Sequence, residues 1–329
     1  MSKLPLTMAA VDYDRLAPIR DGRVPVEGID LELLPMEVEE IFYRQARYAE
    51  FDVSEMSLST YVLSLGRESF DYVAIPVFPS RYFRHQTMFI NTRSGIERAE
   101  DLRGRRVGVP EYQITAGVWQ RGILADDHGV QPRDVTWFSG GVEQPGRIEK
   151  QRIALPDDVA VTAIGPEQTL SAMLASGEID ALLSAHVPTA FYRHEHVRRL
   201  FPDYKAVEQD YFRRTGIFPI MHLVVVRRSL LAREPWVARS LLKAFERARR
   251  VAREDLMYRS SLKVMLPWLA DHVDETVAVL GEDYWTYGIE PNRHVLETFL
   301  RYSHEQGLAA RRYEPEELFA PSTATEFVV

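Results

Sequence analysis

Short apolar runs alternate with amphipathic stretches along the first part of the chain. Apolar runs with the length and polar boundaries of β-strands lie at residues 4–11, 29–34, 51–56 and 70–77. Between two of them, residues 38–49 carry apolar and aromatic positions at helical spacing. This strand, helix, strand order with short connections predicts a parallel sheet covered by helices.

The same order of elements returns in the middle of the chain. A turn and a short strand are predicted within residues 101–109, and further strands at residues 135–138 and 179–183. Helices are predicted from residue 115 to His128-Gly129 and over residues 170–177, and each ends at a glycine. The repetition predicts a second parallel sheet, and ligands bind at the carboxyl ends of the strands in such sheets.

Later segments of the sequence predict that the chain returns to the region formed by the first strands. Residues 217–226 form the most strand-like run of the sequence, and Pro235 opens a helix with a continuous apolar face. Amphipathic helices follow to about residue 308, whereas residues 143–158 are polar, lack periodicity and predict an exposed excursion. Because 329 residues exceed the usual size of one hydrophobic core, we expect two lobes. The first comprises residues 1–90 and 220–329 and the second residues 91–219.

Composition narrows the classes of function. A formal net charge of -8 argues against sequence-independent nucleic-acid binding, which requires a basic face. The absence of cysteine excludes disulfides, thiolate catalysis and cysteine-ligated metal sites. No apolar run reaches the length of a signal peptide or a membrane span, so we expect a cytoplasmic protein without a membrane partner. The long C-terminal helices offer a surface for a homo-oligomer.

One segment is unusual for a loop, because it is aromatic and cationic. Residues 75–91 read IPVFPSRYFRHQTMFIN and include Arg81 and His85 between two strand-like runs. Surface loops without a binding role are typically rich in Gly, Ser, Asn and Lys, whereas this composition suits a flat or anionic ligand. We therefore expect residues 78–85 to bind a ligand and residues 87–91 to cross between the lobes.

Three histidines are candidates for acid–base chemistry. His85, His186 and His222 each fall at a predicted strand end or lobe crossing, and imidazole exchanges protons near neutral pH. A structural, hydrogen-bonding role is the alternative for each of them. Glu111, just before a predicted helix, is the fourth candidate.

Other polar residues are candidates for substrate binding. Guanidinium groups match carboxylates, which makes Arg15 and Arg81 the expected anchors. Hydroxyls and amides near predicted helix starts suit an anion, although helix capping explains them equally well. The candidate substrate-binding residues are Asp14, Arg15, Ser57, Ser59, Arg81, Gln113 and Thr115.

No strong catalytic motif is present in the sequence. It contains no GxGxxG, HExxH or GxSxG sequence and no phosphate-binding glycine loop. The run His194-Glu195-His196 resembles a metal-binding pattern, but the neighbouring Arg193, Arg198 and Arg199 would repel a metal ion. We expect this run to form a solvated face, and no metal site is predicted.

Distributed motifs give the sequence a family resemblance. The motifs are DYDR at residues 12–15, EMSLSTY at 55–61, IPVFPSRYFRH at 75–85, GVPEYQITAGVW at 108–119 and TGIFPIMH at 215–222. Together they resemble the 4,5-dihydroxyphthalate decarboxylases, over residues 6 to about 292. That family is similar to type II periplasmic binding proteins and to the synthases of the thiamine pyrimidine precursor.

The resemblance implies an α/β, two-lobed, type II periplasmic-binding-protein-like fold with two crossing strands, a C-terminal helical region and a ligand cleft. Residues 87–91 and 220–226 match the crossing strands. The implied activity is decarboxylation of 4,5-dihydroxyphthalate to protocatechuate and CO2 without a cofactor, with a small aromatic carboxylate as the partner. Two alternatives remain: a cytoplasmic protein that only binds an aromatic acid, and a synthase that consumes one of its own histidines. Fold alone does not decide between them.

Overall fold

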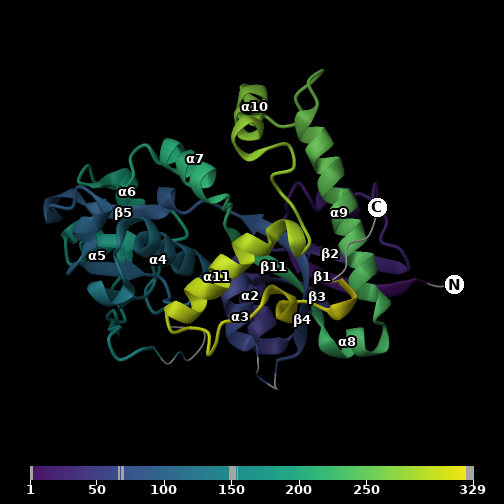
Figure 1. Ribbon diagram of the computed structural model, residues 1–329, viewed down its shortest axis with the longest axis horizontal. Helices are drawn as coiled ribbons and strands as arrows, with labels where there is room; N and C mark the ends of the chain where they lie inside the picture. Colours follow the sequence, from purple (N-terminus) through teal and green to yellow (C-terminus); the bar gives the residue numbers. More distant parts are fainter. Residues whose placement is uncertain (1–2, 66, 68–69, 148–152, 154, 324–329) are drawn as a thin grey trace. The chain divides into compact units, whose positions relative to one another are not determined.

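The structure is a computed structural model that describes residues 3–65, 67, 70–147, 153 and 155–323 (Figure 1). The chain forms two compact units. Unit 1 comprises Met1–Arg81, Ile220–Glu297 and Tyr313–Val329, and unit 2 comprises Tyr82–Pro219 and Thr298–Arg312. This division differs from the expected one in residues 82–90 and 298–312, which the sequence analysis assigned to the first lobe.

Unit 1 is built on a five-stranded sheet in the order β2-β1-β3-β11-β4. Strand β11 runs antiparallel to its neighbours β3 and β4, whereas β1, β2 and β3 are parallel. The carboxyl ends of β1, β3 and β4 therefore share one sheet edge with the amino end of β11. The strands are β1 (Leu4–Ala10), β2 (Ile29–Pro35), β3 (Val53–Ser57), β4 (Tyr72–Arg81) and β11 (Ile220–Arg227).

Helices pack on this sheet through apolar faces. The long helix α9 buries the face expected from the sequence, including Val237, Leu241 and Phe245, and it contacts β4 (Figure 1). Ser57 begins α3 by accepting a hydrogen bond from the Thr60 amide at 3.3 Å. The helices are α1 (Ala17–Arg20), α2 (Val38–Tyr48), α3 (Leu58–Ser64), α8 (Arg228–Arg233), α9 (Trp236–Met257), α10 (Leu269–Leu280) and the start of α11 (Arg293–Glu305).

Unit 2 is built on a six-stranded sheet in the order β10-β5-β9-β6-β7-β8. The strands β6, β7, β8 and β9 are parallel, and β5 runs antiparallel to β9 and β10. The amino end of β5 thus shares an edge with the carboxyl ends of the parallel strands. The strands are β5 (Met88–Asn91), β6 (Arg106–Val109), β7 (Thr136–Ser139), β8 (Val161–Ala163), β9 (Ala181–Leu183) and β10 (Val197–Arg199).

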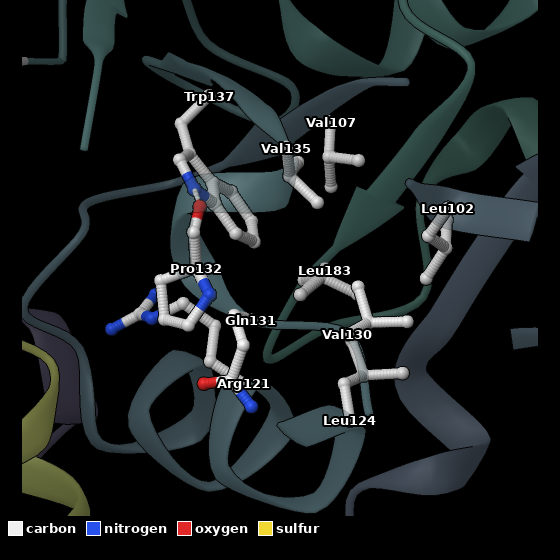
Figure 2. A pocket seen from close by; sticks show the side chains of 10 residues that line it. All are labelled: Leu102, Val107, Arg121, Leu124, Val130, Gln131, Pro132, Val135, Trp137 and Leu183. Carbon is white, nitrogen blue, oxygen red and sulfur yellow. Dashed lines mark hydrogen bonds between the residues drawn. The ribbon is translucent and has the colours of Figure 1, made fainter. Parts of the chain in front are cut away.

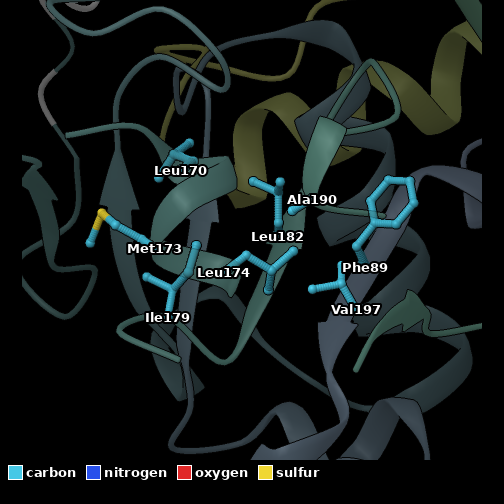
Figure 3. Packing of buried hydrophobic residues seen from close by; sticks show 8 residues of the cluster. All are labelled: Phe89, Leu170, Met173, Leu174, Ile179, Leu182, Ala190 and Val197. Atoms are coloured by element: carbon cyan, nitrogen blue, oxygen red, sulfur yellow. The ribbon is translucent and has the colours of Figure 1, made fainter. Parts of the chain in front are cut away.

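In the core of unit 2, apolar side chains of the sheet pack against those of the helices. Figure 3 shows the buried cluster formed by Phe89, Leu170, Met173, Leu174, Ile179, Leu182, Ala190 and Val197. Helix α4 (Thr115–His128) ends at Gly129, whose φ of 64° suits a glycine, and α5 (Leu170–Ser176) ends in the same way at Gly177. Both ends were predicted. The remaining helices are α6 (Thr189–Arg193) and α7 (Tyr204–Thr215).

Residues 298–312 belong to unit 2 because they pack on α4. A Cβ atom added at Gly122 would lie 2.1 Å from the Tyr302 ring, so only glycine permits this approach. Gln306 accepts a hydrogen bond from Arg121 Nε at 2.8 Å, and Tyr302 donates one to Asp126 at 2.6 Å. The last helix therefore contributes to both units.

The chain leaves unit 1 after Arg81 and returns before Ile220. Arg81 and Ile220 pair at the ends of β4 and β11, and the Tyr82 amide donates a hydrogen bond to the Pro219 carbonyl at 3.1 Å. The expected crossing at residues 87–91 is wrong, because β5 pairs with β9 and β10 inside the unit 2 sheet. β11 lies within the unit 1 sheet and begins at the return point.

Part of the polar excursion expected at residues 143–158 lies outside the described residues. Those that are described include the exposed Glu143 and Gln144. Among the helices of the described ranges, not one is both long enough and apolar enough to cross a bilayer.

Candidate active site

The carboxyl edge of the unit 1 sheet brings together residues from distant parts of the sequence. Tyr13 follows β1, Glu55 lies in the middle of β3, and His222 lies near the start of β11. His222 pairs in register with Ser57 of β3 and with Ser80 of β4. This edge is where α/β proteins place their ligands.

Glu55 and His222 form a hydrogen-bonded pair at this edge. Oε1 of Glu55 lies 2.5 Å from Nδ1 of His222, and Oε2 accepts a hydrogen bond from the Val11 amide at 3.0 Å. The Glu55 side chain is fully buried. Burial alone would raise the pKa of this carboxyl, but the hydrogen bond and charge of His222, with the Val11 amide and Tyr13 hydroxyl, hold it below its usual value. Glu55 is therefore ionised at neutral pH.

Tyr13 completes the surroundings of the Glu55 carboxylate. Its hydroxyl donates a hydrogen bond to Oε1 of Glu55 at 2.7 Å. Burial raises the pKa of Tyr13 well above its usual range, and the negative charge of Glu55 adds to the effect. Tyr13 therefore remains a hydrogen-bond donor at any pH at which the protein works.

The other side of the His222 ring lies against Phe42 and is partly exposed. Phe42 packs edge-on against it, with ring centroids 5.0 Å apart. No atom in the described part of the chain hydrogen-bonds Nε2 of His222, and 15% of the side chain is exposed. The ionised Glu55 assigns the proton of the neutral ring to Nδ1. Nε2 is therefore the atom that can exchange a proton with a ligand.

Arg15 lies beside this pair, on the same loop as Tyr13. Its Cζ atom is 3.9 Å from the centroid of the Tyr13 ring and 4.3 Å from that of Trp285. Nε donates to the Pro79 carbonyl at 2.6 Å, and Nη1 donates to Asp14 at 2.9 Å. The Asp14 side chain is 65% exposed, so its contact with Arg15 is open to solvent.

Ser57, Ser59 and Arg81 also lie in unit 1 but have structural contacts. Ser57 caps α3, and Ser59 is buried in the first turn of that helix. Arg81 is buried and donates hydrogen bonds to the Thr286 carbonyl, at 2.8 Å, and to the Asn292 side chain. Burial lowers the pKa of Arg81 to about 9. These contacts favour a structural role for Arg81 over carboxylate binding.

Glu111, Gln113 and Thr115 lie at the corresponding edge of unit 2, between β6 and α4. Glu111 is buried, and its Oε1 accepts from Arg147 Nε at 2.8 Å and Nη2 at 2.6 Å. Gln113 donates to the other carboxylate oxygen at 3.3 Å. Thr115 is the first residue of α4 and is buried. The Arg147 ion pair fixes the Glu111 side chain.

Arg121 holds the loop that carries Glu111. Arg121 lies in the middle of α4, and its buried side chain donates to the Tyr112 carbonyl at 2.6 Å. Arg121 is one of the residues that line a cavity of about 10 Å³, most of whose lining side chains are apolar. Figure 2 shows these side chains. A cavity of this size is near the lower limit for one water molecule and cannot hold an aromatic acid.

His85 is a buried residue of unit 2, in the short helix η1 (His85–Thr87). Its ring packs edge-on against Phe201 and Tyr211, at centroid distances of 5.4 and 5.1 Å, and its Nδ1 is 3.9 Å from Glu208. Burial lowers the pKa of His85 to about 4, so the ring is neutral at neutral pH. These surroundings favour packing over proton transfer.

His186 follows β9 and is exposed. Its amide donates a hydrogen bond to the Ser184 hydroxyl at 3.1 Å, which fixes the backbone of the loop. His194 and Glu195 are also exposed, and Nε2 of His196 lies 2.9 Å from the Ala175 carbonyl. The described residues contain no group of three His, Asp or Glu side chains arranged like metal ligands.

Glu55, Tyr13 and Trp285 were not among the residues expected from the sequence. Glu55 could have been found, because a glutamate inside the apolar run of residues 51–56 needs a buried partner. Tyr13 belongs to the DYDR motif that already supplied Asp14 and Arg15. Trp285 lies in an irregular segment far along the chain, and no local pattern connects it with Arg15.

Comparison with known proteins gives both a fold and a family. The periplasmic aliphatic sulphonate binding protein SsuA of Escherichia coli has a similar structure, with a TM-score of 0.53 and 11% identity over 98% of this chain and 99% of that chain. Protein AF1704 of Archaeoglobus fulgidus gives a TM-score of 0.52 and 15% identity over 92% and 98%. These similarities confirm the type II periplasmic-binding-protein-like fold.

Sequence similarity is stronger and more specific. No family model matches the sequence. A 4,5-dihydroxyphthalate decarboxylase of Pseudomonas putida is 45% identical over 214 residues, covering 65% of this chain and 83% of that protein. A 4,5-dihydroxyphthalate decarboxylase of Comamonas testosteroni is 41% identical over 330 residues, covering 100% of both chains. The chain belongs to the 4,5-dihydroxyphthalate decarboxylase family.

Proposed function

We propose that the protein removes one carboxylate of 4,5-dihydroxyphthalate as CO2 and releases protocatechuate, with His222 as the proton donor. The observation that carries the proposal is the hydrogen bond between His222 and the buried, ionised Glu55. Family membership supports the substrate and the reaction. His222 supports the mechanism, because its Nε2 has no hydrogen-bond partner among the described residues.

The reaction needs a proton at the carbon that loses its carboxylate. Direct loss of CO2 from an aromatic ring would leave an aryl carbanion, whereas protonation of the ring carbon first gives a quinoid intermediate. Each carboxylate of 4,5-dihydroxyphthalate lies para to a hydroxyl, so an ionised hydroxyl pushes electron density onto that carbon. The carbon–carboxylate bond then breaks, its electrons restore the aromatic ring, and CO2 leaves.

His222 fits the role of acid because its Nδ1 hydrogen-bonds the Glu55 carboxylate, which leaves Nε2 for the substrate. In the proposed step the imidazolium gives its Nε2 proton to the ring carbon, and solvent later restores the proton. The Glu55 carboxylate holds the ring orientation and the tautomer throughout. Val11 and Tyr13 hold the carboxylate in turn, so the donor is fixed before substrate binds.

A separate group must accept the phenolic proton, because this hydroxyl and the reacting carbon lie on opposite sides of the ring. His186 is our candidate, since it is an exposed imidazole after a parallel strand. His85 is buried, and Glu111 is held in an ion pair with Arg147. Substituting His186, His85 and Glu111 one at a time tests which of them accepts the phenolic proton.

Arg15 is the proposed anchor for a substrate carboxylate. Its Nη2 atom makes no hydrogen bond with any residue in the described ranges, whereas Nε and Nη1 have protein partners. A guanidinium edge of this kind suits a carboxylate oxygen. Asp14 and the hydroxyls of Ser57 and Ser59 are weaker candidates, because Asp14 carries a negative charge and the two serines lie in the first turn of α3.

The test of the proposed function is product analysis with purified protein. 4,5-Dihydroxyphthalate carrying isotopic carbon in both carboxylates should yield one labelled CO2 for each protocatechuate over many turnovers. Recovery of intact substrate after long incubation would contradict the proposal and select a binding protein. A reaction that stops after one equivalent would select a synthase that consumes its own histidine.

A further inference from the structure

The guanidinium of Arg15 lies over two aromatic rings from distant parts of unit 1. Its Cζ atom lies 3.9 Å from the Tyr13 ring centroid and 4.3 Å from the Trp285 ring centroid. Only 14% of the Arg15 side chain is exposed. A cation at these distances from two aromatic rings is attracted to both.

Two successive carbonyls of β4 fix this arrangement. Trp285 Nε1 donates to the Phe78 carbonyl at 2.9 Å, and Arg15 Nε donates to the Pro79 carbonyl at 2.6 Å. The stacked side chains are thus attached to neighbouring residues of one strand. Arg81, two residues after Pro79, donates to the Thr286 carbonyl at 2.8 Å and thereby holds the segment that carries Trp285.

Tyr13 connects this cation to the acid–base pair. Its ring stacks on Arg15, and its hydroxyl donates to Glu55 Oε1 at 2.7 Å, the same oxygen that contacts His222. One side chain therefore contributes separately to the anion-binding group and to the proton donor. The two contributions use different atoms, so substitutions can separate them.

We infer that Trp285 is a positioning residue that holds Arg15 for the carboxylate that the substrate retains, which makes the site selective for ortho-dicarboxylates. This inference rests on the proposed function. Nε and Nη1 of Arg15 have protein partners, which leaves Nη2 for a ligand, and a guanidinium N–H matches a carboxylate oxygen. A retained carboxylate bound there keeps its ortho neighbour, the group to be lost, in a fixed place on the ring.

Phthalate is the probe for this role, because it has both carboxylates but lacks the hydroxyls that decarboxylation requires. Trp285→Met keeps an apolar side chain but removes the π face. We expect it to weaken phthalate binding about 3- to 30-fold, as measured by calorimetry and by competitive inhibition. KM for 4,5-dihydroxyphthalate should rise by a similar factor while kcat changes less. Trp285→Phe restores a stacking face and should bind phthalate within about threefold of wild type.

Matched variants separate this role from general damage to the fold. Tyr13→Phe keeps the ring but loses the hydroxyl, so kcat should fall while phthalate binding stays within about threefold of wild type. Trp268→Met removes a tryptophan that is 68% exposed and should change neither quantity. If Trp285→Met does not fold, Trp285→Leu is measured with the same expectation.

The outcomes distinguish the inference from the proposed function. Wild-type phthalate affinity in the Trp285→Met or Trp285→Leu variant would overturn the inference even if CO2 release is normal. Weakened phthalate binding in these variants, with restoration by Trp285→Phe, would support it even if the wild-type protein released no CO2. Arg15→Lys must also weaken phthalate binding, and unchanged affinity in that variant would overturn the anchor itself.

Discussion

Nδ1 of His222 lies 2.5 Å from Oε1 of Glu55, and that carboxylate is fully buried. A buried charge is costly unless it is paired and hydrogen-bonded. Here the second oxygen accepts from the Val11 amide, and the Tyr13 hydroxyl adds a third bond to the carboxylate. The arrangement therefore fixes His222 beside a buried carboxylate, and it is formed entirely within unit 1.

Glu55→Gln tests the contribution of the buried charge. The amide keeps a hydrogen-bond acceptor for His222 but cannot stabilise an imidazolium. We expect kcat for 4,5-dihydroxyphthalate to fall about 100-fold or more, with a smaller change in KM. Glu282→Gln, at a side chain that is 84% exposed, is the control and should keep wild-type kinetics. Wild-type kcat in Glu55→Gln would remove the carboxylate from the mechanism.

The effect of Glu55→Gln on the free energy of unfolding should depend on pH. Because the pKa of Glu55 is lowered in the folded protein, its stabilising effect is present above the ordinary carboxyl range and is lost as pH falls through the lowered value. The loss of unfolding free energy caused by Glu55→Gln should therefore be larger at pH 7 than in acid. Urea unfolding at several pH values measures this, and a pH-independent difference would contradict it.

His85→Gln distinguishes packing from catalysis. With a pKa lowered by burial to about 4, His85 stabilises the fold above pH 6.5, and this effect declines as pH falls toward 4. We expect kcat to stay within about threefold of wild type. The loss of unfolding free energy should grow between pH 4 and 6.5 by up to about 3 kcal/mol. A loss of kcat comparable to that of a His222 variant would instead make His85 a catalytic residue.

Glu208→Gln tests a buried carboxyl in unit 2. Burial raises the pKa of Glu208 to about 7, against hydrogen bonds from the Gln86 amide and side chain. The unfolded chain ionises first as pH rises, so the wild-type fold loses stability between about pH 4.5 and 7. Relative to wild type, Glu208→Gln should gain up to about 3 kcal/mol over that range. The exposed Glu195→Gln is the control, and parallel stability curves for Glu208→Gln and wild type would refute the prediction.

The sequence predicted the larger elements of the fold because their hydrophobic periodicity is clear. β1, β2 and β11 and the buried face of α9 appear close to their expected positions. β8 and β10 were missed, because each has three residues and β10 includes Arg198 and Arg199. A pairing partner in the sheet, rather than apolar alternation, makes those segments strands.

The candidate site was predicted in part. His222 and Arg15 were among the candidates, because a histidine near a strand end and an arginine after a strand are visible in the sequence. Their partners were not, because Glu55 and His222 meet through the pairing of β3 with β11, and Trp285 reaches Arg15 through contacts with β4. His85 is buried whereas His222 is partly exposed, and composition alone did not reveal this difference.

The most direct test of the account is the turnover of His222→Gln on 4,5-dihydroxyphthalate, measured as CO2 release at saturating substrate. The account predicts a fall in kcat of about 10²- to 10⁴-fold with phthalate affinity within about threefold of wild type, because the proton donor is lost and the carboxylate anchor remains. His272→Gln, at an exposed histidine of α10, should release CO2 at the wild-type rate. CO2 release by folded His222→Gln within threefold of wild type would contradict the account.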